Sequence, residues 1–169
     1  MTTILSKLRE LLHYITNHFY PQTSITNEDV TSNIVVGSSG SAGIDLPAYE
    51  DVIINPREKT MIKHLVKTIS SKDVAFLVLG RSSGNKHPSL IIQPGLIDSD
   101  YRGYIHTSVL NITDDEVKIN AGTRLSQLLA VKIVQPTQMK LEGIEIIDRE
   151  RGTSWLGSSD KYLKTDKSS

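Results

Sequence analysis

Five short segments of the sequence combine glycine with charged side chains and hydroxyl groups. They lie at residues 41–46, 80–83, 94–103, 122–128 and 151–159. Arginine binds anions bidentately, and backbone N–H groups exposed beside glycine form anion-binding nests. Such donors indicate a site for a small polyphosphate. Asp45 and Asp98 lie among them and would repel a bare triphosphate. We therefore expect these carboxylates to hold a divalent cation through its waters, or to orient and deprotonate an attacking water.

Other common catalytic arrangements fit the sequence poorly. The glycines at 37, 40 and 43 form a glycine-rich loop, but no Gly-Lys-Ser/Thr follows, so the loop is not a P-loop. The five histidines do not fall at metal-ligand spacing on one element, which favours surface or core roles for them. Residues 96–99 resemble the loop of aspartic proteases only faintly, because Asp100 stands where the tight turn needs glycine.

The composition of the 169-residue chain restricts the partners that we expect. Nineteen basic and nineteen acidic residues give a formal charge of zero, which argues against nucleic acid as a partner. The absence of cysteine excludes disulfide scaffolds, thiolate nucleophiles and cysteine zinc sites. No apolar run approaches the ~20 residues of a membrane span, and residues 1–20 lack the features of a signal peptide. We expect no membrane partner, and a cytoplasmic or nuclear location, with a viral particle as a further option.

The elements that position the five segments are expected to be short strands. In residues 1–20, apolar residues at spacings of three and four predict an amphipathic helix that ends before Pro21 and could bind a protein partner. Residues 22–33 are polar and are interpreted as a linker. Short β-branched runs are found at 34–36, 52–54, 61–68, 74–79, 90–92, 105–111, 116–119, 128–134 and 144–147. They predict an all-β barrel or sandwich over residues 34–148, because the helices of parallel crossovers are missing. Residues 149–169 are expected to form a mobile arm.

In this order, the five segments resemble the five sequence motifs of the trimeric dUTP pyrophosphatases (dUTPases), over about residues 34–160. The spellings Ser-Ala-Gly-Ile-Asp-Leu and Gly-Arg-Ser-Ser are most similar to the retroviral branch. The resemblance implies a β-barrel or jelly-roll subunit that assembles as a homotrimer, here with an additional N-terminal helix. Each active site would lie between subunits. The implied reaction is hydrolysis of dUTP to dUMP and pyrophosphate with Mg²⁺, which limits uracil in DNA and supplies dUMP.

The resemblance assigns the third motif to catalysis and to nucleoside recognition. Asp98 matches the aspartate that activates water for in-line attack at the α-phosphorus. Tyr101 matches the tyrosine whose ring backs the deoxyribose and leaves no room for a 2′-hydroxyl. The hairpin residues that read uracil through their backbone are Gly95, Leu96 and Ile97, and Gly103 belongs to the same substrate-binding segment.

The other four motifs are assigned to the phosphates and the cation. The phosphate-binding positions are Arg81, Ser82, Ser83 and Gln127, together with Arg151, Gly157 and Ser158 of an arm that closes over a neighbour's site. Closing such an arm excludes water and strengthens the charge contacts inside. Asp45 is expected to reach Mg²⁺ only through water. Arg124 forms either an ion pair with Asp45 or a ligand contact.

Three departures from the family pattern leave an alternative open. Trp155 and Leu156 stand where the family usually has glycine and then an aromatic residue, so that Leu156 would cover the base. Tyr104 replaces an acidic or small polar residue, and Ser126 replaces alanine. The alternative is a dUTPase-fold module that binds a nucleotide or a protein partner with weak or lost catalysis. A dCTP deaminase would need a general acid/base glutamate near the pyrimidine, for which the sequence offers no convincing candidate.

Overall fold

The computed structural model describes residues 6, 7, 9, 23–28, 34–82, 87–140 and 142–144. Its secondary-structure elements are strands and one short 3₁₀ helix, η2 (Pro136–Gln138). No helix in the described part of the chain is long and apolar enough to span a bilayer. The helix expected over residues 1–20 is not confirmed. Only Ser6, Lys7 and Arg9 of that segment are described, and although their backbone is helical, they define no helical element.

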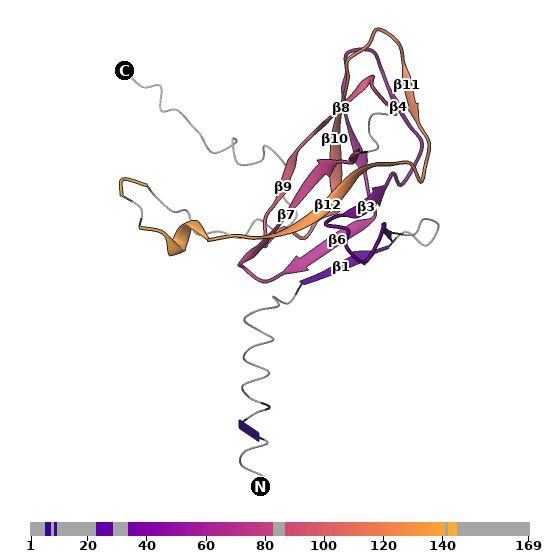
Figure 1. Cartoon of the computed structure of the whole chain (residues 1–169). Helices are drawn as coiled ribbons and strands as arrows, with labels where there is room; N and C mark the ends of the chain where they lie inside the picture. Colours follow the sequence, from indigo (N-terminus) through magenta and orange to yellow (C-terminus); the bar gives the residue numbers. More distant parts are fainter. Residues whose placement is uncertain are drawn as a thin grey trace, which may run out of the picture.

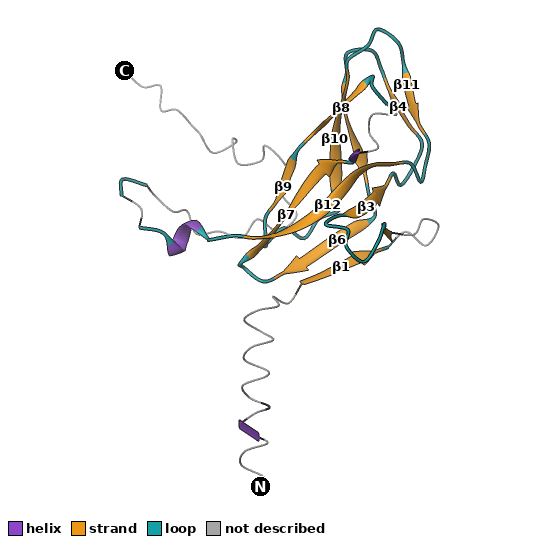
Figure 2. Ribbon diagram, viewed as in Figure 1, coloured by secondary structure: helices purple, strands orange, loops and turns teal. Residues whose placement is uncertain are grey.

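The described strands form four sheets (Figure 1). The strands are β1 (Thr23–Asn27), β2 (Val35–Val36), β3 (Ile44–Pro47), β4 (Val52–Ile54), β5 (Lys59–Lys63), β6 (Val66–Ser70), β7 (Val74–Gly80), β8 (Leu90–Gln93), β9 (Gly95–Ile97), β10 (His106–Asn111), β11 (Val117–Ile119) and β12 (Arg124–Lys132). The largest sheet has the order β2-β3-β12-β7-β9, and the others are β5-β10-β8, β11-β4 and β1-β6. Figure 2 shows the strands gathered into one elongated body, from which residues 133–140 run outward. The all-β prediction is confirmed.

Three strands were missed by the sequence patterns, and one predicted strand is divided. β1 lies inside the predicted linker because its polar sequence, largely exposed, lacks the alternation of a half-buried strand. β3 and β9 lie within the first and third motifs. The run at 61–68 is split between β5 and β6 at His64, whose N–H donates to the carbonyl of Ile105 at 2.9 Å. Of the strand predicted at 144–147, Ile144 is not in a strand, and the rest lies outside the described residues.

Two hydrophobic clusters fill the interior of the body. The first contains Leu46, Val66, Phe76, Val78, Ile97, Tyr101, Ile105 and Leu128. The second contains Ala48, Ile54, Ile62, Val109, Ile119 and Leu125. Because Ile97 and Tyr101 belong to the first cluster, the third motif is fixed to the core by apolar packing.

A buried polar network of His64, Thr107 and Ser126 extends to the fourth motif. The Nδ1 atom of His64 lies 2.6 Å from the carbonyl oxygen of Pro47, which can only accept, so Nδ1 donates. Nε2 then accepts from the hydroxyl of Thr107 at 2.7 Å, and this hydroxyl lies 2.6 Å from that of Ser126. Burial lowers the pKa of His64 to about 4, so the ring is neutral at pH 7. His64 is a core histidine, as the histidine spacing predicted.

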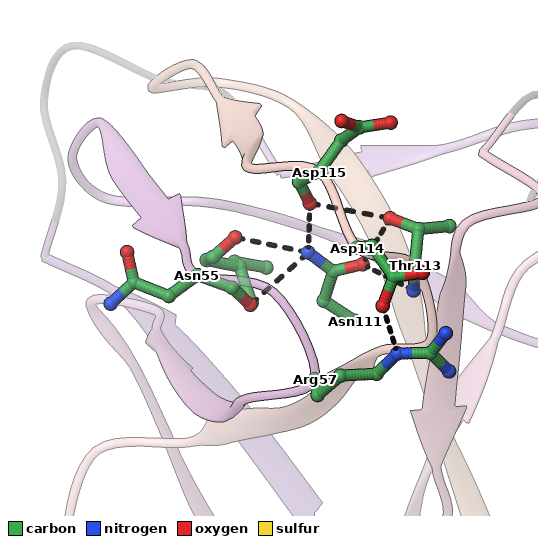
Figure 3. Close-up of polar contacts among 7 residues, drawn as sticks. Asn55, Arg57, Asn111, Thr113, Asp114 and Asp115 are labelled. Atoms are coloured by element: carbon green, nitrogen blue, oxygen red, sulfur yellow. Dashed lines mark hydrogen bonds and ion pairs between the residues drawn. The ribbon is translucent and has the colours of Figure 1, made fainter.

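A second polar group, the Asn111 junction, joins the turn after β4 to the turn after β10 (Figure 3). The Asn111 amide nitrogen lies 3.1 Å from the carbonyl oxygens of Ile54 and Asn55 and 2.7 Å from that of Asp115. Its carbonyl oxygen accepts from the N–H and the hydroxyl of Thr113, at 3.0 and 2.8 Å. Asn111 is completely buried, and both ends of its amide bond to the chain itself.

Candidate functional site

The strand register brings the first, second and fourth motifs together. Asp45 on β3 is the direct partner of Gln127 on β12, and Ser126 is the partner of Gly80 at the end of β7. Arg81 follows Gly80, and its N–H donates to the carbonyl of Leu125 at 3.1 Å. Residues from three strands therefore meet at one end of the largest sheet.

An ion pair fixes the guanidinium of Arg81 at this end of the sheet. Its Nε lies 2.7 Å from Oδ1 of Asp45, and its Nη1 donates to the carbonyl of Arg124 at 2.9 Å. The Asp45 side chain is 13% exposed and that of Arg81 is 29% exposed, so the pair is partly shielded from water. Holding the guanidinium in one orientation reduces the entropy that it would lose when it binds an anion.

Of the two alternatives for Arg124, the ion pair with Asp45 is not formed, because Asp45 pairs with Arg81 instead. Arg124 lies opposite Pro47, next to a register shift, whereas the strand partner of Asp45 is Gln127. The Nε of Arg124 is buried and has no hydrogen-bond partner. Since an unpaired buried donor is costly, this N–H indicates an acceptor that the described residues do not supply. We call Asp45, Arg81, Arg124 and Gln127 the Arg81 cluster.

Gln127 packs closely against the first motif. Its Nε2 donates to the carbonyl of Gly80 at 3.2 Å. A Cβ atom at position 43 would lie 2.5 Å from Oε1 and 3.3 Å from Cβ of Gln127, so Gly43 leaves room for this side chain. Ser82 is exposed beside the cluster. A cavity of about 540 Å³ lies next to Arg81, lined also by Gly80, His87, Pro88, Leu90, Ile92 and Leu125. Sequence reasoning did not identify its residues from β8.

The third motif forms the edge of the same sheet. β9 pairs with β7 so that Gly95 faces Val78 and Ile97 faces Phe76. Ile97 is buried, whereas the Leu96 side chain is 54% exposed. β9 is the last strand in its sheet, so its outer backbone edge has no strand partner among the described residues. Such an edge can form hydrogen bonds with a planar polar ligand.

Residues 98–104, which we call the Tyr101 turn, follow β9. The N–H of Tyr101 donates to the carbonyl of Asp98 at 3.1 Å, and its hydroxyl donates to the carbonyl of Tyr104 at 2.9 Å. The Tyr101 side chain is buried, and this burial raises its pKa. A Cβ atom at position 103 would lie 2.6 Å from the Cζ atom of Tyr101, so only Gly103 accommodates the ring. Asp98 is half-buried at the start of the turn.

The structure does not bring Asp98 and the Arg81 cluster together within one chain. Continuing the β7–β9 register places Asp98 opposite Ala75, six residues before Arg81, so the two lie about 20 Å apart at 3.3 Å per residue. Within one chain, the two groups thus lie at opposite ends of β7, one strand of the largest sheet.

Comparisons with known proteins connect this geometry to a family. The dUTPase family model matches residues 31–160, which is more than half of the chain and spans all five motifs. The chain belongs to the dUTPase family. It is 40% identical over 125 residues to deoxyuridine 5′-triphosphate nucleotidohydrolase from Pseudomonas fluorescens (strain Pf0-1), covering 71% of this chain and 82% of the relative. It is also 36% identical over 124 residues to the Gag-Pro polyprotein of mouse mammary tumor virus, covering 73% of this chain and 14% of the polyprotein, so the similarity extends to a retroviral protein.

A solved dUTPase structure supports the fold assignment. A mutant dUTPase from phage phi11 of S. aureus superposes with a TM-score of 0.64 at 22% identity, covering 74% of this chain and 97% of that one. At this identity the likeness establishes the fold alone. The chain described above is thus an all-β protein with the dUTPase fold.

Several predicted site residues of this dUTPase family member lie outside the described residues. They are Ser83, Arg151, Leu156, Gly157 and Ser158. Among the described residues, no group of three or more His, Cys, Asp or Glu side chains could hold a metal ion. Asp45 is the carboxylate of the Arg81 cluster.

Proposed function

We propose that this protein hydrolyses dUTP to dUMP and pyrophosphate. The observation that carries the proposal is the family match over residues 31–160, which includes every motif position assigned above. The activity would use Asp98 to deprotonate and aim a water molecule at the α-phosphorus. The alternative, a nucleotide- or partner-binding module with weak or lost catalysis, has no observation in its favour.

The Arg81 cluster is proposed to bind the triphosphate. Arg81, held by Asp45, presents its remaining N–H groups to phosphate oxygens, and Ser82 and Gln127 add hydrogen bonds. The unpaired Nε of Arg124 favours a ligand contact for this residue over a purely structural role. Ser83, together with Arg151, Gly157 and Ser158 of the arm, would complete the phosphate contacts.

The Tyr101 turn and β9 are proposed to bind the nucleoside. The unpaired edge of β9, over Gly95, Leu96 and Ile97, supplies backbone groups for the polar edge of uracil. The Tyr101 ring, fixed by its hydrogen bond to Tyr104, would back the deoxyribose, with Gly103 leaving room for it. A rigid wall at the sugar discriminates against ribose by shape. Leu156 would cover the base.

The donor set fits a Mg²⁺ ion that arrives with the nucleotide. Mg²⁺ keeps several waters and is commonly held by substrate phosphates and one or two carboxylates. Asp45 is the carboxylate of the Arg81 cluster and would reach the ion through water. When bound, the ion neutralises phosphate charge that develops during hydrolysis.

A homotrimer is proposed because the chain belongs to the dUTPase family and because its site residues are widely separated within one chain. The separation of about 20 Å between Asp98 and Arg81 along β7 supports their being supplied by different subunits. Exposed apolar side chains are available for contacts between subunits: Leu96 on β9 is 54% exposed, and Val134 and Ile144 beyond β12 are 62% and 63% exposed. Residues 133–140 extend from the body, where they could reach a neighbour (Figure 1).

The activity is tested by measuring pyrophosphate release from dUTP with Mg²⁺. We expect turnover by the purified protein and a loss of at least ~10²-fold in kcat for Asp98→Asn, because the general base is removed. Asp100→Asn, which removes a neighbouring carboxylate of the same turn, is the matched control and should retain most activity. The absence of turnover, or equal rates for Asp98→Asn and the unaltered protein, would refute the proposal.

Shared sites between subunits are tested by complementation. Asp98→Asn and Arg81→Ala chains should each be inactive alone, whereas their co-expression should restore about a quarter of the sites in randomly mixed trimers. Light scattering should give the mass of three chains. No recovery in mixed assemblies of correct mass would contradict the proposed sharing.

A further inference from the structure

The departure from the family pattern at Tyr104 lies in a charged and aromatic cluster of its own. The Nζ atoms of Lys63 and Lys67 lie 4.8 and 4.3 Å from the centre of the Tyr104 ring. The Tyr104 hydroxyl donates to Oε2 of Glu28, whose Oε1 accepts from Lys67 at 2.9 Å. The bond from Tyr104, and next that from Lys67, lower the pKa of Glu28. Two cations therefore hold the ring, and a carboxylate fixes its hydroxyl.

The backbone of the same residue holds the Tyr101 ring. The Tyr104 carbonyl accepts from the Tyr101 hydroxyl at 2.9 Å and from Nδ1 of His106 at 2.8 Å. The next residue, Ile105, donates its N–H to the carbonyl of Val66 on β6 at 2.8 Å. The position of Tyr104 thus determines where the Tyr101 hydroxyl is anchored. The Tyr104 side chain contacts Glu28 and the two lysines, whereas its carbonyl oxygen binds Tyr101 and His106.

Glu28 lies at the end of a segment that is held to the body by one strand pairing and by the packing of Ile25 against the first hydrophobic cluster. Among the described strands, β1 pairs only with β6, and Glu28 follows β1, with its N–H donating to the carbonyl of Leu65 at 2.7 Å. Two-stranded pairings are marginal by themselves, so side-chain contacts matter for holding this segment. The contact of Glu28 with Tyr104 joins positions 76 residues apart in the sequence.

We propose that Glu28 is a positioning residue for nucleoside recognition. By fixing the Tyr104 side chain between Lys63 and Lys67, it sets the Tyr104 carbonyl and, through it, the Tyr101 ring. This proposal rests on the proposed function, because it assumes that the deoxyribose of the substrate lies against the Tyr101 ring. A displaced ring would admit a 2′-hydroxyl, so Glu28 would contribute to discrimination between dUTP and UTP without touching either nucleotide.

The kinetic test compares Glu28→Gln and Tyr104→Phe with the unaltered protein. Each should raise KM for dUTP and lower the ratio of kcat/KM for dUTP to that for UTP by about 5- to 10-fold, with kcat for dUTP changed less than twofold. The double variant should show no more loss than either single variant, because both remove one connection. Asp114→Asn, which removes an exposed carboxylate ion-paired with Arg57, is the matched control and should leave the ratio unchanged.

A second measurement keeps the proposal separate from the proposed activity. In protein labelled with fluorotyrosine, the ¹⁹F resonance of Tyr101, assigned with Tyr101→Phe, should shift or broaden in Glu28→Gln and Tyr104→Phe but not in Asp114→Asn. If the unaltered protein does not hydrolyse dUTP, the proposed function fails, and the resonance still decides the positioning role. A Tyr101 resonance that is the same in all variants, or a dUTP/UTP ratio within twofold of the unaltered protein, overturns the proposal.

Discussion

The Asn111 junction is completely buried and the Arg81 cluster is partly buried, and the two differ in how completely the described residues satisfy their polar groups. Both ends of the Asn111 amide are bonded to the surrounding backbone and to Thr113. In the Arg81 cluster, Asp45 and Arg81 pair with each other, while the Nε of Arg124 stays buried without a partner. Polar groups that satisfy one another stabilise the fold, whereas a buried donor without an acceptor indicates a ligand or a neighbouring subunit.

The largest loss of activity is expected for substitutions of Arg81, because the incompletely satisfied cluster is expected to serve binding rather than stability. Arg81→Ala should lower kcat/KM for dUTP by about 10²–10³-fold, because it removes bidentate phosphate contacts and releases Asp45. Arg81→Lys should recover only part of the loss, since lysine lacks the planar fork. Steady-state kinetics, with circular dichroism to verify folding, would check this. Full activity of Arg81→Ala would show that the Arg81 cluster does not bind the substrate.

At the Asn111 junction, a substitution is expected to lower stability and to leave activity almost unchanged. Asn111→Ala should lower the free energy of unfolding by about 2–3 kcal/mol, because three backbone carbonyls lose their shared donor. Urea denaturation measures this loss. At a temperature where the variant is folded, kcat/KM should stay within twofold of the unaltered value. A loss of activity in fully folded Asn111→Ala would contradict the assignment of the Asn111 junction to stability and of the Arg81 cluster to function.

The network of His64, whose ring nitrogens are both hydrogen-bonded within the chain, should make stability depend on pH. The pKa of His64 is lowered from 6.5 to about 4 by burial, so the unfolded chain binds the proton more readily than the folded protein does. Stability should therefore fall as the pH decreases below 6.5, by about 2 kcal/mol between pH 7 and pH 5. The difference in this pH dependence between the unaltered protein and His64→Gln isolates the contribution. Parallel pH profiles for the two proteins would contradict the assignment.

The smallest effect is expected at Arg124. Arg124→Lys keeps the charge but removes the buried Nε–H, so stability should be unchanged or slightly higher while KM for dUTP rises about 10-fold, equivalent to ~1.4 kcal/mol. Thermal unfolding and kinetics on the same sample check both parts. A clear loss of stability with unchanged KM would instead place Arg124 among the structural residues.

Much of the fold and the composition of the Arg81 cluster could be predicted from the sequence. Apolar alternation indicated most strands, and the order of the glycine-bearing segments placed Asp45, Arg81 and Gln127 in one group. The pairing of Asp45 with Arg81 could not be predicted, because it depends on β3 and β7 lying on either side of β12, and no local sequence signal gives that strand order. β1 was missed because its exposed polar residues lack a buried face. The contact between Glu28 and Tyr104 was also missed, since nothing local connects residues so far apart.

The placement of Asp98 and Arg81 at opposite ends of β7 has a consequence for the dependence of activity on protein concentration. Under the proposed assembly, a lone chain carries every catalytic group and yet completes no reaction centre, so monomers contribute no residual turnover. Specific activity should then collapse on dilution below the concentration at which subunits dissociate. In a cell with little of the protein, the total rate of hydrolysis would rise more steeply than the concentration of the chain. Assembly of the subunits would then control the activity.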